Sequence, residues 1–190
     1  MITVTQRETE GPKIHPKKAM LWFSIVSMNM IFAGLTSAMF VSKSDNWFSF
    51  DLPYTLWISS AVILVSSITM QQALHAAKNG AFSKVRTMMM ATLVLGLTFT
   101  ALQFVSWVIL VQHNVFFVGN DTSASFLYVI TAAHLAHLLF GLVALVVSWT
   151  KSLKNKYTPG QTVGLELTAI FWHFLDGLWI YLFLFLLYIR

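Results

Sequence analysis

Five uninterrupted apolar segments, each long enough to cross a lipid bilayer, constrain this chain more than any other feature. A helix needs about 20 apolar residues to span the hydrocarbon core. The predicted spans cover residues 19–41, 54–76, 87–111, 125–149 and 163–189. Backbone polar groups must be satisfied inside the bilayer, and segments of this length do so as helices. The expected fold class is therefore all-α: a polytopic membrane protein built as a bundle of five transmembrane helices joined by short loops.

The composition supports a membrane protein and excludes several kinds of site. Of the 190 residues, 57% are hydrophobic and 10% are charged, which is typical of a polytopic membrane protein rather than of a soluble domain. The chain has no cysteine, so disulfides, thiolate metal ligands and thiol nucleophiles are excluded. We expect two parts, a polar cytoplasmic tail at residues 1–17 and a five-helix membrane domain at residues 18–190.

The distribution of basic residues predicts the orientation of the bundle. The net charge is +5, and most of the 12 Lys and Arg residues fall on one side of the predicted spans. These are Arg7, Lys13, Lys17, Lys18, Lys78, Lys84, Arg86, Lys151, Lys154 and Lys156. The other side carries Lys43 and Arg190. By the positive-inside rule, the N-terminus is cytoplasmic and the C-terminus lies on the opposite side. Because the basic residues alternate between loops, they indicate topology, and no nucleic-acid partner is expected.

Small and polar residues recur at helical spacing in several spans, which favours close approach between helices. Gly34 and Ala38 are four positions apart, as are Ala132 and Ala136. The second and third spans carry stripes of small polar residues. These are Ser59 with Ser66, Ser60 with Ser67, and then Thr92, Gly96, Thr100 and Gln103. We interpret all of these stripes as surfaces for helix packing.

The fifth span contains ionisable residues within an apolar run. His173 and Asp176 share one helical face, and Glu166 lies close to it two turns earlier. A carboxylate inside a membrane is costly, so it normally faces a bundle interior and has a partner. The fourth span offers His134 and His137 on one side. By the rise of about 1.5 Å per residue, His137, His173 and Asp176 lie roughly 18, 15 and 20 Å deep. They could form one cluster if these helices are neighbours, with His134 one turn further out.

Three interpretations of this cluster are open. It could hold haem or copper, since histidine is the commonest metal ligand. It could be a proton relay or a transport site, which intramembrane ionisable residues often mark. It could also be a structural polar network that locks helices together or contacts another subunit. Because no second carboxylate lies near the midplane, we favour the structural network, with no catalytic residue and no metal. Glu166, near the cytoplasmic end, would snorkel or reach a lipid headgroup through a basic neighbour.

Two tryptophans lie deeper than an aromatic belt requires. Trp22 and Trp57 fall near span ends, where tryptophan is usual, but Trp172 and Trp179 flank the His173–Asp176 region. Their depth indicates packing or a protein–protein contact. We predict contacts with lipid or with another subunit for Trp172, Trp179 and Gln103.

Several motifs of the chain together match one family. The segment FWHFLDGLWIYLFLF, preceded by Glu166, resembles the signature of subunit III of the haem–copper terminal oxidases. TAAHLAHLLFG, from Thr131 to Gly141, resembles its T-G-x-H-x-x-H segment with the following glycine. ILVSSIT followed by Ala73 is similar to its SSxT helix, Gln103 falls where the family has a glutamine, and FAGL matches its first shared helix. The resemblance runs from Lys18 to the C-terminus.

The resemblance implies a metal-free accessory subunit in the five-helix form of the family, which lacks the first pair of helices. Such a subunit packs on catalytic subunit I beside subunit II, with subunit IV and a larger respiratory supercomplex as further partners. It holds phospholipid and helps to sustain proton uptake, while haem and copper reside in the partner subunits. The expected location is the bacterial plasma membrane, crossed several times. Two departures, Met28 and Ser106, stand where the family usually has glutamate, which argues against proton conduction by this chain.

Alternatives remain at the sequence level. Within the family, the chain could serve a quinol oxidase, or be the related accessory protein of nitric oxide reductase. From other classes, it could be a haem-bearing membrane anchor using His134, His137 and His173, or a free-standing proton-coupled transporter. The sequence does not name the electron donor.

Overall fold

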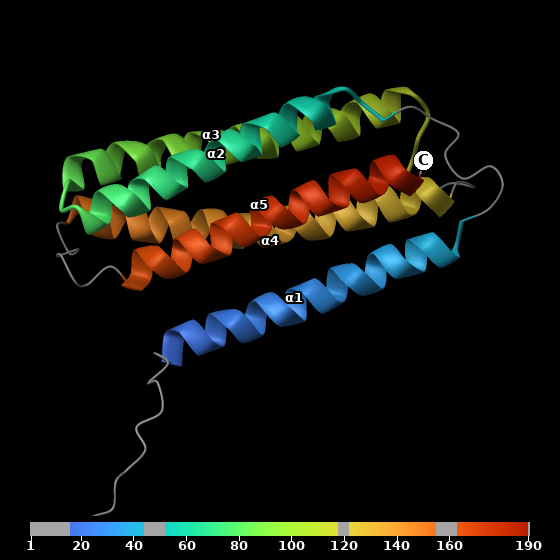
Figure 1. Cartoon of the computed structure of the whole chain (residues 1–190). Coiled ribbons are helices and arrows are strands. Elements are labelled where there is room, and N and C mark those ends of the chain that lie inside the picture. Colours follow the sequence, from blue (N-terminus) through green and yellow to red (C-terminus); the bar gives the residue numbers. More distant parts are fainter. Residues whose placement is uncertain (1–15, 44–51, 118–121, 155–162, 190) are drawn as a thin grey trace, which may run out of the picture.

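The chain folds into five long helices in a computed structural model that describes residues 16–43, 52–117, 122–154 and 163–189 (Figure 1). The helices are α1 (Pro16–Val41), α2 (Thr55–Lys78), α3 (Phe82–Gln112), α4 (Thr122–Leu153) and α5 (Val163–Ile189). All 5 are long and apolar enough to cross a membrane. The predicted all-helical class is confirmed. Most of the polar tail predicted at residues 1–17 lies outside the described residues.

Several helices extend beyond the predicted spans into the polar residues that flank the apolar core. α5 begins and ends where the sequence predicts, whereas α3 begins at Phe82 rather than at residue 87 and α4 continues to Leu153. The added first turn of α3 contains Lys84 and Arg86. Hydropathy marks the hydrocarbon core, but a helix continues into the headgroup region, where charged side chains are solvated. The predicted boundaries are therefore short at these ends.

A tight turn joins α2 to α3 at Asn79–Gly80, as the turn residues predict. Gly80 has φ 72°, in the left-handed region that glycine adopts without a Cβ penalty. The amides of Asn79 and Ala81 donate to the carbonyls of His75 and Ala76 at 3.2 and 3.0 Å, which satisfies the last carbonyls of α2. The short turn places α2 and α3 side by side along their length.

Four of the helices form a closed square to which α1 is added. α2 contacts α3, α3 contacts α4, α4 contacts α5, and α5 returns to α2. α1 contacts α4 and α5 and, among the described residues, neither α2 nor α3. Figure 1 shows α1 on the side of α4 and α5 that faces away from α2 and α3. α5 thus contacts three other helices, more than α2 or α3.

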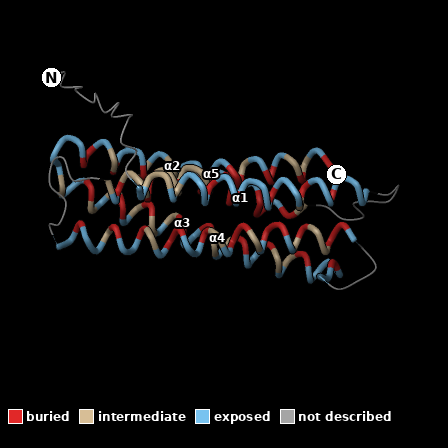
Figure 2. Tube along the Cα trace, turned by 90° about the horizontal axis from the view of Figure 1, so that it is seen from below, coloured by how far each residue is buried: buried red, intermediate tan, exposed pale blue. Residues whose placement is uncertain are grey.

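α1 packs through one narrow stripe. Ile25, Met28, Phe32, Thr36 and Met39 are buried at spacings of three and four residues, which is one face of a helix. The other faces expose large apolar side chains such as Phe23, at 74%. Figure 2 shows the same division in all the helices, with exposed positions on the outward sides. An apolar exterior of this kind suits a surface that contacts lipid.

The small residues interpreted as helix-packing surfaces divide into two groups, and for one group the interpretation does not hold within this chain. Gly34, Ala38, Ala132 and Ala136 are exposed on the outside of the chain and separate no pair of its own helices. The close approaches occur instead at glycines of α3 and α4. A Cβ at Gly96 would lie 2.8 Å from Trp172, and one at Gly141 would lie 2.8 Å from Leu175. Spacing alone does not tell an inward small residue from an outward one.

Candidate functional site

The two deep tryptophans of α5 attach this helix to serines of α2. Trp172 Nε1 donates to Ser66 Oγ at 3.1 Å, and Trp179 Nε1 donates to Ser60 Oγ at 3.0 Å. The donors are seven residues apart on α5 and the acceptors are six apart on α2, so the two antiparallel helices stay in contact at both levels. An indole N–H buried in an apolar medium needs an acceptor, and the serine stripe provides one at each level.

This arrangement corrects the prediction for the tryptophans and for Gln103. Trp172, Trp179 and Gln103 are exposed by 0, 1 and 1%, respectively. None of the three therefore reaches lipid or a neighbouring subunit directly, because each lies inside the square of helices. Both amide atoms of Gln103 lack a hydrogen-bond partner among the described residues. Ordered water is the usual partner of such buried atoms.

His173 faces α2 rather than α4. Its Nδ1 lies 2.7 Å from Ser67 Oγ, and its Nε2 lies 3.2 Å from Gln71 Oε1. The two partners are four residues apart on α2, so one helical face supplies both. Sequence reasoning missed Gln71, although a polar pair spaced by four in an apolar span is a usable signal. Ser67 was noted only as a packing residue.

Asp176 is buried on the same face of α5, one turn beyond His173. Its side chain is 3% exposed. Neither carboxyl oxygen makes a hydrogen bond with the described residues. An ionised carboxylate in this position would lack compensation for its lost hydration, which costs several kcal/mol.

The histidines of α4 form a second and separate group. The His134 ring is 0% exposed and lies 5.1 Å from the Trp179 ring, 6.1 Å from Phe99 and 6.4 Å from Phe32, measured between centroids. His137 Nδ1 lies 2.7 Å from the carbonyl of Ala133, in its own helix. Neither ring nitrogen of His134 has a hydrogen-bond partner within the described part of the chain.

The four residues predicted to form one cluster therefore form two groups. α4 and α5 are neighbours, which is the condition for the predicted cluster. However, His173 and Asp176 turn toward α2, while His134 and His137 lie among aromatic rings. Equal depth does not bring side chains together when their helices present different faces. Within the described residues, no three His, Cys, Asp or Glu side chains are arranged to hold a metal.

Short contacts between hydroxyl groups also join neighbouring helices at other positions along the bundle. Thr55 pairs with Ser106 at 2.7 Å between α2 and α3, and Ser148 pairs with Thr168 at 2.7 Å between α4 and α5. Ser106 stands at a position where the resemblance led us to expect a glutamate. In this chain the Ser106 hydroxyl has the uncharged Thr55 hydroxyl as its partner on α2. These pairs give the buried hydroxyls partners without placing a charge in the bundle.

An ion pair that includes Glu166 joins α1 and α5 near the N-terminal ends of these two helices. Lys18 Nζ donates to Glu166 Oε2 at 2.9 Å, with side chains 38 and 25% exposed. A half-exposed ion pair of this kind contributes about 0–1 kcal/mol. A carboxylate in the first turn of α5 also suits the positive end of the helix dipole. Lys18 of α1 is therefore the basic neighbour of Glu166.

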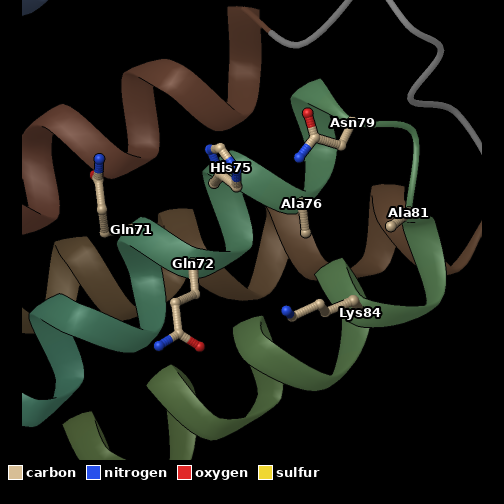
Figure 3. Close-up of a pocket in the computed structure, with 7 residues that line it drawn as sticks. All are labelled: Gln71, Gln72, His75, Ala76, Asn79, Ala81 and Lys84. Atoms are coloured by element: carbon tan, nitrogen blue, oxygen red, sulfur yellow. The ribbon is translucent and has the colours of Figure 1, made fainter.

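Two cavities border the His173 region. One, of about 400 Å³, lies at the α2–α3 turn and is drawn in Figure 3. Its wall consists of Gln71, Gln72, His75, Ala76, Asn79, Ala81 and Lys84. The other, of about 280 Å³, lies between α1 and α5 and includes Asn29, His173 and Gly177 in its wall. Gln71 and His173, which contact each other, thus belong to different cavities.

The fold defines the chain as a multi-pass helical membrane protein whose buried polar side chains mostly bond from one helix to the next. Comparison with known proteins then identifies its family. The family model for cytochrome c oxidase subunit III matches residues 16–190, and the chain belongs to this family.

Three bacterial relatives illustrate the similarity. The cytochrome c oxidase subunit 3 of Corynebacterium diphtheriae is 32% identical over 170 residues, which cover 85% of this chain and 82% of the relative. The probable subunit 3 of Nocardia farcinica is 30% identical, covering 98% of this chain and 95% of the relative. That of Mycobacterium leprae is 27% identical, covering 100% and 95%. The similarity to these proteins is thus spread over nearly their whole lengths.

Proposed function

We propose that this chain is the non-catalytic subunit III of a proton-pumping haem–copper oxygen reductase, a cytochrome c oxidase of the bacterial plasma membrane. The observation that carries this proposal is the family match over residues 16–190, which includes all five helices. Within that complex, the chain is an accessory subunit of an oxidoreductase. Haem and copper reside in partner subunits, and this chain carries no redox centre.

The first role is to stabilise the catalytic subunit. The interior of the bundle is joined by hydrogen bonds between helices, such as Trp172–Ser66 and Ser148–Thr168, which make it a stiff body to pack against. Its outer surface presents small residues at Gly34 and Ala38, where another helix can approach closely. Subunit I is the expected neighbour, with subunit II, subunit IV and a larger supercomplex around it.

The second role is to bind phospholipid and to support sustained proton uptake. By the positive-inside rule, the basic residues at the end of the bundle where α1 begins would face the cytoplasm. They include Lys18, Lys78, Lys84 and Lys151. Basic side chains near that surface attract anionic lipid headgroups, by about 1 kcal/mol each. The same side of the membrane supplies the protons that oxygen reduction consumes.

Co-purification tests this function. An affinity tag on the N-terminal tail, mild-detergent extraction and mass spectrometry should recover a haem–copper catalytic chain together with a copper-binding cupredoxin chain. Recovery with the catalytic chain of a quinol oxidase or a nitric oxide reductase would move the protein to another branch. Recovery of this chain alone, from membranes that contain an active oxidase, would overturn the proposal. A chain that binds haem by itself would show instead a visible-region spectrum that His134→Ala removes.

A further inference from the structure

One face of α2 changes from apolar to polar inside a predicted span. The residues on this face follow one another at spacings of three and four, which is one side of a helix, and all are exposed: Leu64, Ile68, Gln72, His75 and Asn79. Gln72 lies about 9 Å from the end of α2 along the helix axis. An amide that is exposed to hydrocarbon without a hydrogen-bond partner is costly, so a polar group must reach this part of the face.

The cavity at the α2–α3 turn lies on the polar part of this face. Gln72, His75 and Asn79 belong to its wall, and the first turn of α3 contributes Lys84. Figure 3 shows the Lys84 side chain extending from α3 toward α2, beside Ala76. The volume of about 400 Å³ falls within the range of small-ligand sites, which is about 300–1,000 Å³. The cavity is therefore large enough for the polar end of a ligand.

The wall of this cavity carries a positive charge that the described residues do not neutralise. Lys84 supplies the charge, and no carboxylate among the described residues belongs to the wall. The acidic side chains of the described part of the chain are Glu166 and Asp176. Glu166 pairs with Lys18, and Asp176 is buried inside the bundle. Because Lys84 has no ion pair with any described residue, an anion is the partner that this cavity suits.

Hydrogen-bond donors lie around this cation. Gln72 and Asn79 carry amide N–H groups and line the cavity. Gln71, also in the wall, is held by His173 at 3.2 Å. Ala81 precedes α3 and makes no side-chain cap hydrogen bond, so the first amides of the helix also favour an anion. A phosphate group offers several acceptor oxygens to such a set, and its hydrogen bonds with an ammonium group are charge-assisted.

We propose that this cavity binds the phosphate group of one anionic phospholipid. Lys84 pairs with the phosphate, and Gln72 and Asn79 donate to its oxygens. The acyl chains follow Leu64 and Ile68 toward the middle of the bilayer. The order of apolar and polar residues along α2 favours a lipid over a soluble anion, which would contact only the polar part.

The proposal rests on the proposed function, which places this turn at the cytoplasmic surface of a bilayer. It goes beyond a general attraction between basic residues and anionic lipid, because it assigns one lipid to one cavity. General attraction depends on charge alone, whereas a defined site also depends on the uncharged amide donors of its wall. Variants that change one of these properties at a time therefore separate the two.

Photo-crosslinking in the purified complex tests the site. Phosphatidylglycerol with a photoreactive acyl chain is exchanged into the complex of this chain with its partner subunits, and mass spectrometry locates the adduct. The adduct should lie on α2 near Leu64 and Ile68. Photoreactive phosphatidylcholine, which is zwitterionic, is the lipid control and should label this segment about fivefold less. Inorganic phosphate added in excess should not reduce labelling, since it lacks the acyl chains.

Three variants separate a defined site from general attraction. Lys84→Gln should lower the labelling of α2 about tenfold, because a hydrogen bond with a charged group is lost. Lys78→Gln is the matched control, since it removes the same charge from a neighbouring exposed residue outside the wall, and it should lower labelling less. Gln72→Ala leaves the net charge unchanged and should still lower labelling about threefold, because an amide donor is lost.

Three results would overturn the proposal. One is an equal loss of labelling in Lys84→Gln and Lys78→Gln with none in Gln72→Ala, which would leave general attraction alone. Another is displacement by inorganic phosphate, which would assign the cavity to a soluble anion. The third is an unlabelled α2 in the intact complex, as expected if a partner chain covers this surface. Recovery of the catalytic chain is scored in every preparation, so a failed site in an intact complex is distinct from a failure of the proposed function.

Discussion

Trp172 of α5 lies directly against the backbone of Gly96 of α3. A Cβ at residue 96 would be 2.8 Å from the Trp172 Cη2 atom and 3.0 Å from a methyl group of Leu142. The indole ring is 0% exposed and fixed at its other edge by Ser66. It has no space to withdraw into. α3 and α5 are diagonal to each other in the square of four helices, and the distance between them is therefore set by the contact of Gly96 with the Trp172 indole.

Replacing this glycine tests the contact. Gly96→Ala should destabilise the subunit by about 1–3 kcal/mol, the usual cost of overpacking a tight interior. The measurement is retention of the subunit in the complex as detergent is titrated. Gly177→Ala is the matched control, because a Cβ there meets nothing within 4 Å and alanine is the better helix former. Equal retention of the two variants would show that the diagonal is not tightly packed.

The indole–serine bonds predict unequal effects of neighbouring serines. Ser66→Ala leaves the Trp172 N–H without its acceptor, whereas Ser59 bonds to the Leu56 carbonyl of its own helix. Interhelical hydrogen bonds in membranes average about 0.6 kcal/mol. Ser66→Ala should therefore lower the thermal stability of the complex measurably and Ser59→Ala should not. Matching shifts in the two variants would contradict the assignment.

Single cysteines can establish the orientation, since the chain has none of its own. Lys43 follows α1 at one end of the bundle and Asn79 lies in the α2–α3 turn at the other, and both are exposed. The bias of basic residues predicts that a membrane-impermeant thiol reagent labels Asn79→Cys from the cytoplasmic side and Lys43→Cys from the outside. Labelling of both from one side would refute five spans.

Met28 predicts a difference in chemical labelling from relatives that carry glutamate at the corresponding position. α1 contains no Asp or Glu, so a carbodiimide that modifies buried carboxyl groups should leave a peptide from this helix unmodified. Met28→Glu should introduce labelling there. The same change should weaken the subunit, because Met28 is 8% exposed and a central carboxylate costs about 2.5–3.5 kcal/mol on insertion scales. Labelling of wild-type α1 would show that the reagent modifies another group.

The sequence predicts the elements of this fold better than their mutual contacts. The limits of α5 follow from hydropathy because its whole length is apolar apart from a few residues. The depth of His173 also follows from helix geometry. Its direction does not, because rotation about the helix axis is set by which neighbour offers acceptors, and the serines that decide this lie about 100 residues earlier. Likewise, nothing local distinguishes buried Trp172 from a tryptophan that faces lipid.

The attachment of α1 has a consequence for the order of assembly. Lys18 contacts Glu166 across 148 positions of sequence, and Thr36 contacts Tyr181 across 145. The ribosome therefore delivers α1 first and its partners last. During synthesis, α1 must reside in the bilayer as a separate helix while α2 and α3 associate through their short turn. Its stripe of buried residues is the last surface of the chain to be covered, so during that interval quality-control proteases and chaperones have access to it.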